Sequence, residues 1–495
     1  MAFNVKPKVQ TFEGARAFVR SPEMELYLIV ANSLFSGDSF YETDAERLER
    51  FRAKVAEVAA RAGGQTFLAA LTLYAREVLH LRTTPTMLAS EMFLHALERA
   101  EQAAKWAWVR GDEHLEALAY VQKVGAKFPK RFLRAVAARL STLTERQALR
   151  YGASGKTFSQ RDALRVAHPK TPDARQNALF KFITQGFTAL SSEEAALLPV
   201  VAAARAEGEA VSWENLISAR GSSAETWEAA VELMGYMALL RNLRNLVQHG
   251  VSRAVLEQVA VRLSDPAEVR ASKQMPYRFY SAYKALLPGT PGVLLEALST
   301  AMDLAAEAAP ALGGETLVLI DLSGSMAARL SDRSEVTRLQ AACALGAMLA
   351  RRERTELWAF ASQGRRVLLP QGTPTLIGTE KIEALAPALG GGTQLGAALR
   401  AALTRAYRRV VILTDEQASD DAWSVLRPYL EHHGAASAYI VNLAGYAPSV
   451  VSRHPRVHTV GGFSDRVLEW IGALELGGAV DKILAYAAQK EAVGA

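Results

Sequence analysis

Three stretches of the sequence place oxygen-bearing side chains next to apolar runs or glycines. In the first, the apolar run 317–320 leads into Asp321-Leu-Ser-Gly-Ser325. The second is Gly390-Gly-Gly-Thr393, and in the third the run 409–414 ends at Asp415. Hard divalent cations prefer oxygen ligands, and Mg²⁺ usually keeps several waters as well. These residue types predict a divalent-cation site, with Mg²⁺ as the expected ion and with the following ligands: Asp321, Ser323, Ser325, Thr393 and Asp415.

These stretches belong to a part of the chain in which strand-like runs alternate with helical patterns. The alternation begins after Gly313-Gly314 and predicts a doubly wound α/β sheet. Ligands of such sheets bind outside the carboxyl ends of the strands, which is where Asp321 would lie. The alternative is that the polar residues only cap strand-to-helix turns. The predicted strands are 317–320, 356–361, 367–369, 410–414, 438–443 and 457–460, and the predicted helices are 339–350, 394–406, 422–431 and 465–474.

Residues from about 20 to 310 show apolar side chains at helical spacing almost throughout. The expected helices follow one another with short turn signals between them, such as Gly63-Gly64 and Thr83-Thr84-Pro85. Successive helices without strands predict an all-α HEAT-like solenoid, in which each helix pair buries its apolar face on the next. A compact irregular helical domain is the alternative. The sequence therefore predicts two domains, residues 1–312 and residues 313–495.

Positive charge is concentrated in one segment of the predicted helical domain. The whole chain has a net charge of +6, whereas residues 120–181 contain 14 Lys and Arg against 3 Asp and Glu, a net +11. Exposed helix faces normally mix both signs, so this excess favours a polyanionic partner. Phe128, Phe132 and Val136 would face inward and leave the cations of one helix outside. The candidate phosphate-binding residues are Lys123, Lys127, Lys130, Arg131, Arg134, His168, Lys170 and Arg175.

Other chemistries find little support in the sequence. The single cysteine, Cys343, excludes a disulfide framework, and the nine histidines form no metal-ligand cluster. The stretch 151–157 resembles a phosphate-binding P-loop, but Arg150 stands where the motif requires glycine. We find no catalytic triad, no secretory signal and no run of 18 apolar residues. We therefore expect a cytoplasmic protein that is not an enzyme and has no membrane partner.

The five predicted metal ligands resemble, in order and in strand context, the metal-ion-dependent adhesion site (MIDAS) of a von Willebrand factor A domain. Segments of the helical part, such as Phe128-Pro-Lys-Arg-Phe-Leu-Arg134, are similar to the TROVE domain of the Ro 60-kDa autoantigen (Ro60) family. The two resemblances together cover nearly the whole chain. Other members often have Asn after the second acid of the metal site, where this chain has Glu416. The similar helical segments are 128–137, 160–170, 213–217, 237–246 and 275–286.

The resemblance implies a ribonucleoprotein whose solenoid is closed into a ring by the A domain. It implies that small noncoding Y RNA binds the basic outer surface, and that the single-stranded 3′ end of misfolded noncoding RNA enters the ring cavity. Such a protein would be a monomeric scaffold in RNA quality control and degradation, and Y RNA would tether a 3′→5′ exoribonuclease to it. The residues that this resemblance assigns to the outer surface include Lys130, Arg131, Arg134, His168 and Lys170.

Two other functions start from the A domain instead of the basic segment. In the first, the chain is an adhesion-like adaptor that binds an acidic protein partner through Mg²⁺, with the helices as a platform. In the second, it is a subunit of an ATPase-driven chelatase or remodelling complex. Neither function uses the cations of residues 120–181.

Overall fold

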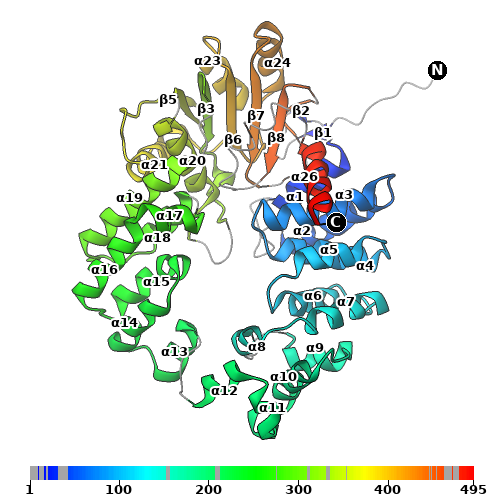
Figure 1. Ribbon diagram of the computed structural model, residues 1–495. Coiled ribbons are helices and arrows are strands. Elements are labelled where there is room, and N and C mark those ends of the chain that lie inside the picture. Colours follow the sequence, from blue (N-terminus) through cyan, green and yellow to red (C-terminus); the bar gives the residue numbers. More distant parts are fainter. Residues whose placement is uncertain are drawn as a thin grey trace, which may run out of the picture. The chain divides into compact units, whose positions relative to one another are not determined.

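The computed structural model describes residues 9–10, 16–17, 20–31, 43–151, 157–206, 212–274, 276–308, 313–330, 335–352, 354–444, 446, 449–452, 454–461, 471 and 479–494. The chain divides into two compact units (Figure 1). The sheet unit comprises Met1–Lys54 and Gly235–Lys482, and the helical unit comprises Val55–Met234 and Ile483–Ala495. Helices α2 (Asp44–Ala59) and α26 (Ala479–Gly494) each contain a point at which the chain passes from one unit to the other.

The sheet unit is built on a six-stranded sheet in the order β5-β4-β3-β6-β7-β8. All neighbouring strands in it are parallel except β4 and β5, which are antiparallel. The strands are β3 (Thr316–Asp321), β4 (Thr355–Phe360), β5 (Gly364–Val367), β6 (Arg409–Thr414), β7 (Ser437–Asn442) and β8 (Val457–Gly461). β3 and β6 are buried along their whole length, as expected of central strands with helices on both faces.

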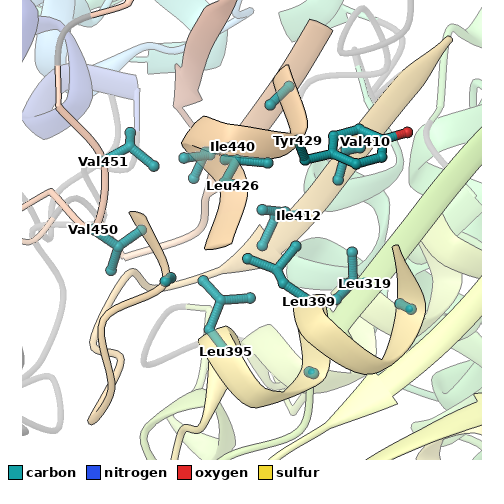
Figure 2. Close-up of a cluster of buried hydrophobic side chains, with 14 of the residues drawn as sticks. Leu319, Leu395, Leu399, Val410, Ile412, Leu426, Tyr429, Ile440, Val450 and Val451 are labelled. Atoms are coloured by element: carbon teal, nitrogen blue, oxygen red, sulfur yellow. The ribbon is translucent and has the colours of Figure 1, made fainter. Parts of the chain in front are cut away.

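One face of the sheet is covered by α23 (Leu395–Ala402) and α24 (Trp423–His432), and the other by α20 (Arg338–Arg352) and α21 (Thr375–Glu383). Figure 2 shows Leu395 and Leu399 of α23 packed on Leu319 of β3 and Ile412 of β6. On the opposite face, a Cβ added at Gly346 of α20 would lie 2.3 Å from Cδ1 of Ile320. A glycine therefore allows α20 to approach β3 closely, and Cys343 of the same helix lies in the core.

The doubly wound sheet predicted from the alternating pattern is confirmed, with differences at element ends. The expected strand 367–369 lies at Gly364–Val367, because the antiparallel edge strand pairs through Gly364 with Phe360 and its exposed arginines gave no apolar signal. The expected helix 394–406 ends at Ala402. The expected helix 465–474 lies outside the described residues apart from Ile471. Helix α26 was not predicted.

The sheet unit also contains helices that precede the sheet in sequence. Helix α1 (Pro22–Ala31) packs beside β8, and its Glu25 lies 3.0 Å from Nζ of Lys54. Thr375 at the start of α21 donates to Asp303 from both its N–H and its hydroxyl, each at 2.7 Å. The remaining elements are β1 (Val9–Gln10), β2 (Arg16–Ala17), α15 (Tyr236–Gln248), α16 (Arg253–Ser264), α17 (Pro266–Ser272), α18 (Pro276–Lys284), α19 (Gly292–Ala308), η2 (Gly324–Ala327) and α22 (Ala386–Leu389).

The helical unit consists of short helices that pack on their next-but-one neighbours as well as on their immediate ones. Helix α4 (Thr83–Leu94) packs on α6 (Glu113–Lys123), and α7 (Lys130–Leu140) packs on both α5 (Ala100–Ala107) and α9 (Gln160–Ala167). This layered stacking is what a helical solenoid requires. The other helices are α3 (Gly64–Glu77), α8 (Glu145–Tyr151), α10 (Ala174–Gln185), η1 (Phe187–Ala189), α11 (Ser192–Ala196), α12 (Pro199–Ala206), α13 (Trp213–Arg220) and α14 (Ala224–Leu233).

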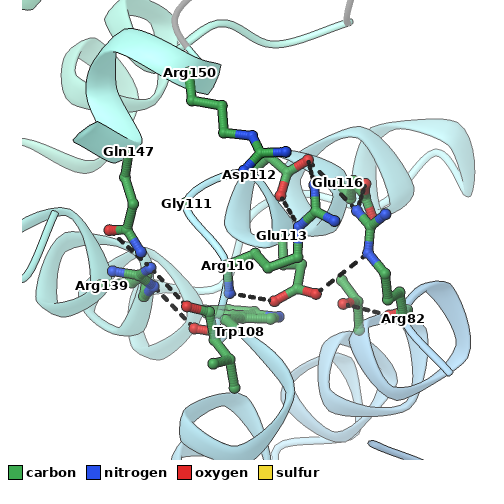
Figure 3. Close-up of polar contacts among 12 residues, drawn as sticks. Arg82, Trp108, Arg110, Gly111, Asp112, Glu113, Glu116, Arg139, Gln147 and Arg150 are labelled. Carbon is green, nitrogen blue, oxygen red and sulfur yellow. Dashed lines mark hydrogen bonds and ion pairs between the residues drawn. The ribbon is translucent and has the colours of Figure 1, made fainter. Parts of the chain in front are cut away.

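Buried polar contacts hold the turns of this unit together (Figure 3). Glu113 is fully buried, accepts the N–H of Arg110 at 2.7 Å and lies 2.9 Å from a guanidinium nitrogen of Arg76. Arg139 donates to the carbonyl oxygens of Trp108 and Val109 at 2.8 and 3.0 Å, and burial lowers its pKa. Such groups are costly to bury unless paired, so each contact fixes the position of a turn.

The C-terminal helix packs on the first helices of the helical unit. The hydroxyl of Tyr486 donates to Glu77 at 2.6 Å, and Nζ of Lys490 lies 2.8 Å from the same carboxylate. Arg99 donates to Glu491 at 2.8 Å. These contacts attach residues from the end of the sequence to α3 and to the turn before α5.

Candidate metal centre and candidate RNA-binding surface

All five predicted metal ligands lie at the carboxyl ends of β3 and β6 or in the loop before α23, and all five are buried. Asp321 is the last residue of β3, and Asp415 directly follows β6. Both strands end at the same edge of the sheet because they are parallel neighbours. Ser323 and Ser325 follow β3 directly, with their hydroxyl oxygens 3.3 Å apart.

Hydrogen bonds tie the three loops to one another. The N–H of Gly324 donates to the carbonyl of Gly391 at 3.0 Å, which joins the first loop to the second. The carbonyl of Thr393 accepts from the N–H and the hydroxyl of Ser419 at 2.7 and 2.9 Å, which joins the second loop to the third. The hydroxyl of Thr414 donates to Oδ2 of Asp321 at 2.6 Å, which joins the third loop to the first.

Burial and a neighbouring negative charge destabilise the charged form of both carboxylates. Burial raises the pKa of Asp321, and the charge of Asp415 raises it further, against smaller lowering by hydrogen bonds from Ser323 and Thr414. Burial also raises the pKa of Asp415, which the hydroxyl of Ser325 and the charge of Arg338 lower in part. Two buried carboxylates this close favour a bound cation or a bound proton.

One oxygen of the cluster fits a metal ion in particular. Oδ1 of Asp415 accepts the N–H of Gln417 at 3.1 Å, whereas Oδ2 is buried and has no hydrogen-bond partner among the described residues. A buried carboxylate oxygen without a partner is costly. Two carboxylates and three hydroxyls are a suitable donor set for Mg²⁺. The residues present therefore fit the predicted ion, and the simpler alternative of turn capping does not explain the free oxygen.

The candidate RNA-binding residues lie on and between helices α6 to α10 of the helical unit. Helices α7 and α9 run in the same direction: the rings of Phe128 and Phe158, just before the two helices, are 6.2 Å apart. Ser141, just after α7, donates to the carbonyl of Lys170, just after α9, at 3.2 Å. We call the following exposed residues the basic surface: Lys123, Lys127, Lys130, Arg134, Arg161, Arg165, His168 and Lys170.

The basic surface keeps its charge because its cations have no ion-pair partner within the part of the chain that the structure describes. The nearby acids are engaged elsewhere. Asp162 accepts from the N–H and hydroxyl of Ser159 in a capping box at the start of α9. Asp173 accepts the N–H of Gln176 and caps α10. Arg161 and Arg165 of α9 are exposed and belong to this surface. The sequence pointed to them only through the positive charge of residues 120–181.

Two of the predicted cations are placed differently. Arg131 makes a two-pronged contact to Glu101 at 3.0 and 2.6 Å and donates to the carbonyls of Leu97 and Glu98. Arg175 donates to Glu145 at 2.7 Å. The other oxygen of Glu145 accepts the N–H groups of Val200 and Val201 at the start of α12. Both arginines therefore connect helices, and neither presents an uncompensated charge.

Sequence reasoning missed Glu416 and Arg20, which form a buried ion pair directly behind Asp415. The departure from Asn at position 416 was the only signal for it. The stretch 152–156 of the rejected P-loop match lies outside the described residues. The residues directly before it form helix α8. In the described part of the chain, no helix is long and apolar enough to cross a membrane.

The fold combines a helical solenoid with a doubly wound α/β sheet of the A-domain type. An acid-and-hydroxyl cluster lies at the strand ends of that sheet. The TROVE domain model matches residues 207–288. Over 195 residues the chain is 32% identical to RNA-binding protein RO60 of Deinococcus radiodurans, a match that covers 34% of this chain and 36% of that relative. Over 76 residues it is 40% identical to telomerase protein component 1 of Rattus norvegicus, covering 15% of this chain and 3% of the relative.

The crystal structure of the Deinococcus radiodurans RO (RSR) protein shares the fold, with a TM-score of 0.59 and 23% sequence identity over 92% of this chain and 99% of that one. The matched stretch spans about a third of the length of the curated RO60 relative. The TROVE match and the RO60 relative make parts of this chain similar in sequence to the Ro60 family, and the RO structure shares its fold.

Proposed function

We propose that this chain is a non-enzymatic RNA-binding protein that holds RNA phosphates on the basic surface. The observation that carries the proposal is the row of exposed cations on α7 and α9 that no carboxylate of the described residues neutralises. The name of the similar Deinococcus radiodurans protein supports the same class of partner. Lysine, arginine and histidine side chains on a helical surface meet phosphates without reading bases, so structure in the RNA would be selected before sequence.

The specific partner in this proposal is a small noncoding Y RNA, with misfolded noncoding RNA as a competitor for the overlapping surface. The protein would then act as a scaffold in RNA quality control, with a 3′→5′ exoribonuclease tethered through the Y RNA. These partners come from the family resemblance. The uncompensated charge supports them because it suits a folded RNA of either kind.

The acid-and-hydroxyl cluster would hold a Mg²⁺ ion with Asp321, Ser323, Ser325, Thr393 and Asp415. The bound ion would supply an open coordination position for an acidic group of a partner. A second candidate function, an adaptor that binds an acidic protein through this ion, is favoured by the partnerless Oδ2 of Asp415. It does not exclude RNA binding, because the two sets of residues share no member.

Crosslinking in cells, followed by sequencing of the bound RNA, tests the RNA proposal. We expect small structured RNAs to be enriched with the wild-type protein. Reversal of two charges, Lys130→Glu with Arg134→Glu, should reduce recovery at least tenfold, because two phosphate contacts become repulsive. The matched control is Lys105→Glu with Arg220→Glu, which changes the net charge equally at exposed positions outside the basic surface. Equal recovery from both variants would contradict the assigned surface, and no enrichment at all would favour the adaptor.

A further inference from the structure

The residue that follows Asp415 has an unusual backbone conformation. Glu416 has φ of 62°, in the left-handed region that glycine and asparagine tolerate and glutamate rarely adopts. Its N–H donates at 3.0 Å to the hydroxyl of Thr414, and that hydroxyl donates in turn to Asp321. The conformation of residue 416 therefore bears on both acids of the candidate metal centre.

The side chain of Glu416 is completely buried, and both of its carboxylate oxygens accept hydrogen bonds. Its Oε2 accepts from Arg20 and from Nδ2 of Asn442, the latter at 2.6 Å. Its Oε1 accepts from the hydroxyl of Ser449 at 3.0 Å and from the N–H of Val450 at 3.3 Å. A carboxylate with four donors, one of them cationic, is fixed in place, and so is the backbone that carries it.

Arg20 connects this carboxylate to a second buried arginine. It donates to the carbonyl of Tyr446 at 3.3 Å, and the hydroxyl of Tyr446 accepts from Arg338 at 3.2 Å. The guanidinium of Arg338 also lies over the ring of Tyr446, 5.6 Å from its centre. Hydrogen bonds therefore connect Glu416 through Arg20 and Tyr446 to Arg338. In contrast, Oδ2 of the adjacent Asp415 has no hydrogen-bond partner among the described residues.

We propose that Glu416 is a positioning residue of the metal centre: its pairing with Arg20 holds residue 416 in the left-handed conformation that directs Oδ2 of Asp415 into the site. Strained backbone persists where surrounding contacts over-determine it, and it gathers at functional sites. Asparagine at position 416 would tolerate the left-handed backbone by itself, whereas glutamate in this chain needs the ion pair with Arg20 to hold it. The inference rests on the proposed metal site.

The rival explanation is an ion pair that only stabilises the fold. Removing one partner of any buried pair destabilises a protein, so stability alone does not separate the two. The two explanations differ in what they predict for side chains at position 416 that tolerate, or do not tolerate, a left-handed backbone. In an Arg20→Met background, Glu416→Asn suits the left-handed conformation, whereas Glu416→Ala does not, and neither variant leaves an unpaired charge between positions 20 and 416.

The test is calorimetric titration of the full-length chain with MnCl₂ and with MgCl₂, together with thermal melting in EDTA. We expect Arg20→Met/Glu416→Ala to bind the metal at least tenfold more weakly than the wild type, and Arg20→Met/Glu416→Asn to bind within threefold of it. Arg405→Met is the control, since it removes an ion pair with Glu315 and Glu356 in the same unit, at the start of the strands. It should leave metal affinity unchanged.

Equal metal affinity of the Asn and Ala variants would overturn the positioning role, even if both melt at lower temperature than the wild type. If the Ala variant does not fold, Glu416→Gln takes its place in the same background: it also lacks the tolerance of asparagine and should bind the metal at least threefold more weakly than the Asn variant. Failure of the wild type to bind either ion would overturn the metal site and this inference together. Binding by the wild type that is lost in Asp321→Ala but kept in the Ala variant would overturn the inference alone.

Discussion

The basic surface and the metal centre use charge in opposite ways. The cations of the basic surface are exposed and have no ion-pair partner within the described chain. The acids Asp321 and Asp415 are buried at the ends of neighbouring strands and accept hydrogen bonds from the residues at those strand ends. A surface of the first kind tolerates loss of one member, because each contact with RNA contributes separately. A cluster of the second kind depends on every member.

The largest expected effect follows from the buried cluster. Asp321→Ala removes one of its two carboxylates and should weaken Mg²⁺ or Mn²⁺ binding more than 100-fold in calorimetric titration. RNA affinity should stay within threefold, because the basic surface contains no residue of the metal centre. A large loss of RNA binding by the folded variant would show that the two regions are coupled.

A comparison within the basic segment gives the next effect. Arg131→Met removes the contacts to Glu101 and to two carbonyl oxygens, and we expect a loss of about 1 kcal/mol in the free energy of unfolding, since the pair is partly exposed. Chemical denaturation measures it. Arg134→Met should leave stability within about 0.5 kcal/mol, because an exposed side chain without an ion pair contributes little. The reverse order of stabilities would contradict the distinction between arginines that connect helices and arginines of the basic surface.

The smallest expected effect concerns pH. The raised pKa of Asp321 means that the metal-free native state holds its proton more tightly than the unfolded chain does. The stabilisation that this proton gives the native state is present at low pH and is lost as pH rises through the pKa of Asp321 in the folded protein. Asp321→Asn should therefore raise the melting temperature in EDTA at pH 8 by about 1–2 °C, the shift that about 1 kcal/mol produces in a unit of about 300 residues. At pH 5 the gain should be smaller, and a larger gain at pH 5 would contradict the raised pKa.

The fold and the placement of the candidate ligands at strand ends were predictable because they depend on local patterns. Continuous apolar runs identified the buried strands β3 and β6, and their parallel arrangement brings Asp321 and Asp415 to the same edge. The edge strand β5 was misplaced because Arg365 and Arg366 interrupt its apolar pattern. Local patterns predict which residues belong to a strand end, and here that was enough to assemble the candidate site.

The parts that could not be predicted depend on contacts between distant residues. Nothing near Arg131 in the sequence indicates that Glu101 occupies it, and nothing near Glu416 indicates Arg20, which lies 396 positions away. A charge count therefore finds a basic segment but does not tell which of its cations are free. The ring closure implied by the family resemblance stays a prediction.

The salt dependence of RNA binding shows whether the cations of the basic surface contact phosphates. Affinity for a small structured RNA should be measured by filter retention across a series of KCl concentrations for the wild type and for Lys130→Gln with Arg134→Gln. Each lost phosphate contact reduces the slope of log affinity against log salt by about 0.7–0.9. Because the variant loses two such contacts, we expect its slope to be shallower than that of the wild type by about 1.4–1.8. Parallel slopes for the two proteins would contradict it.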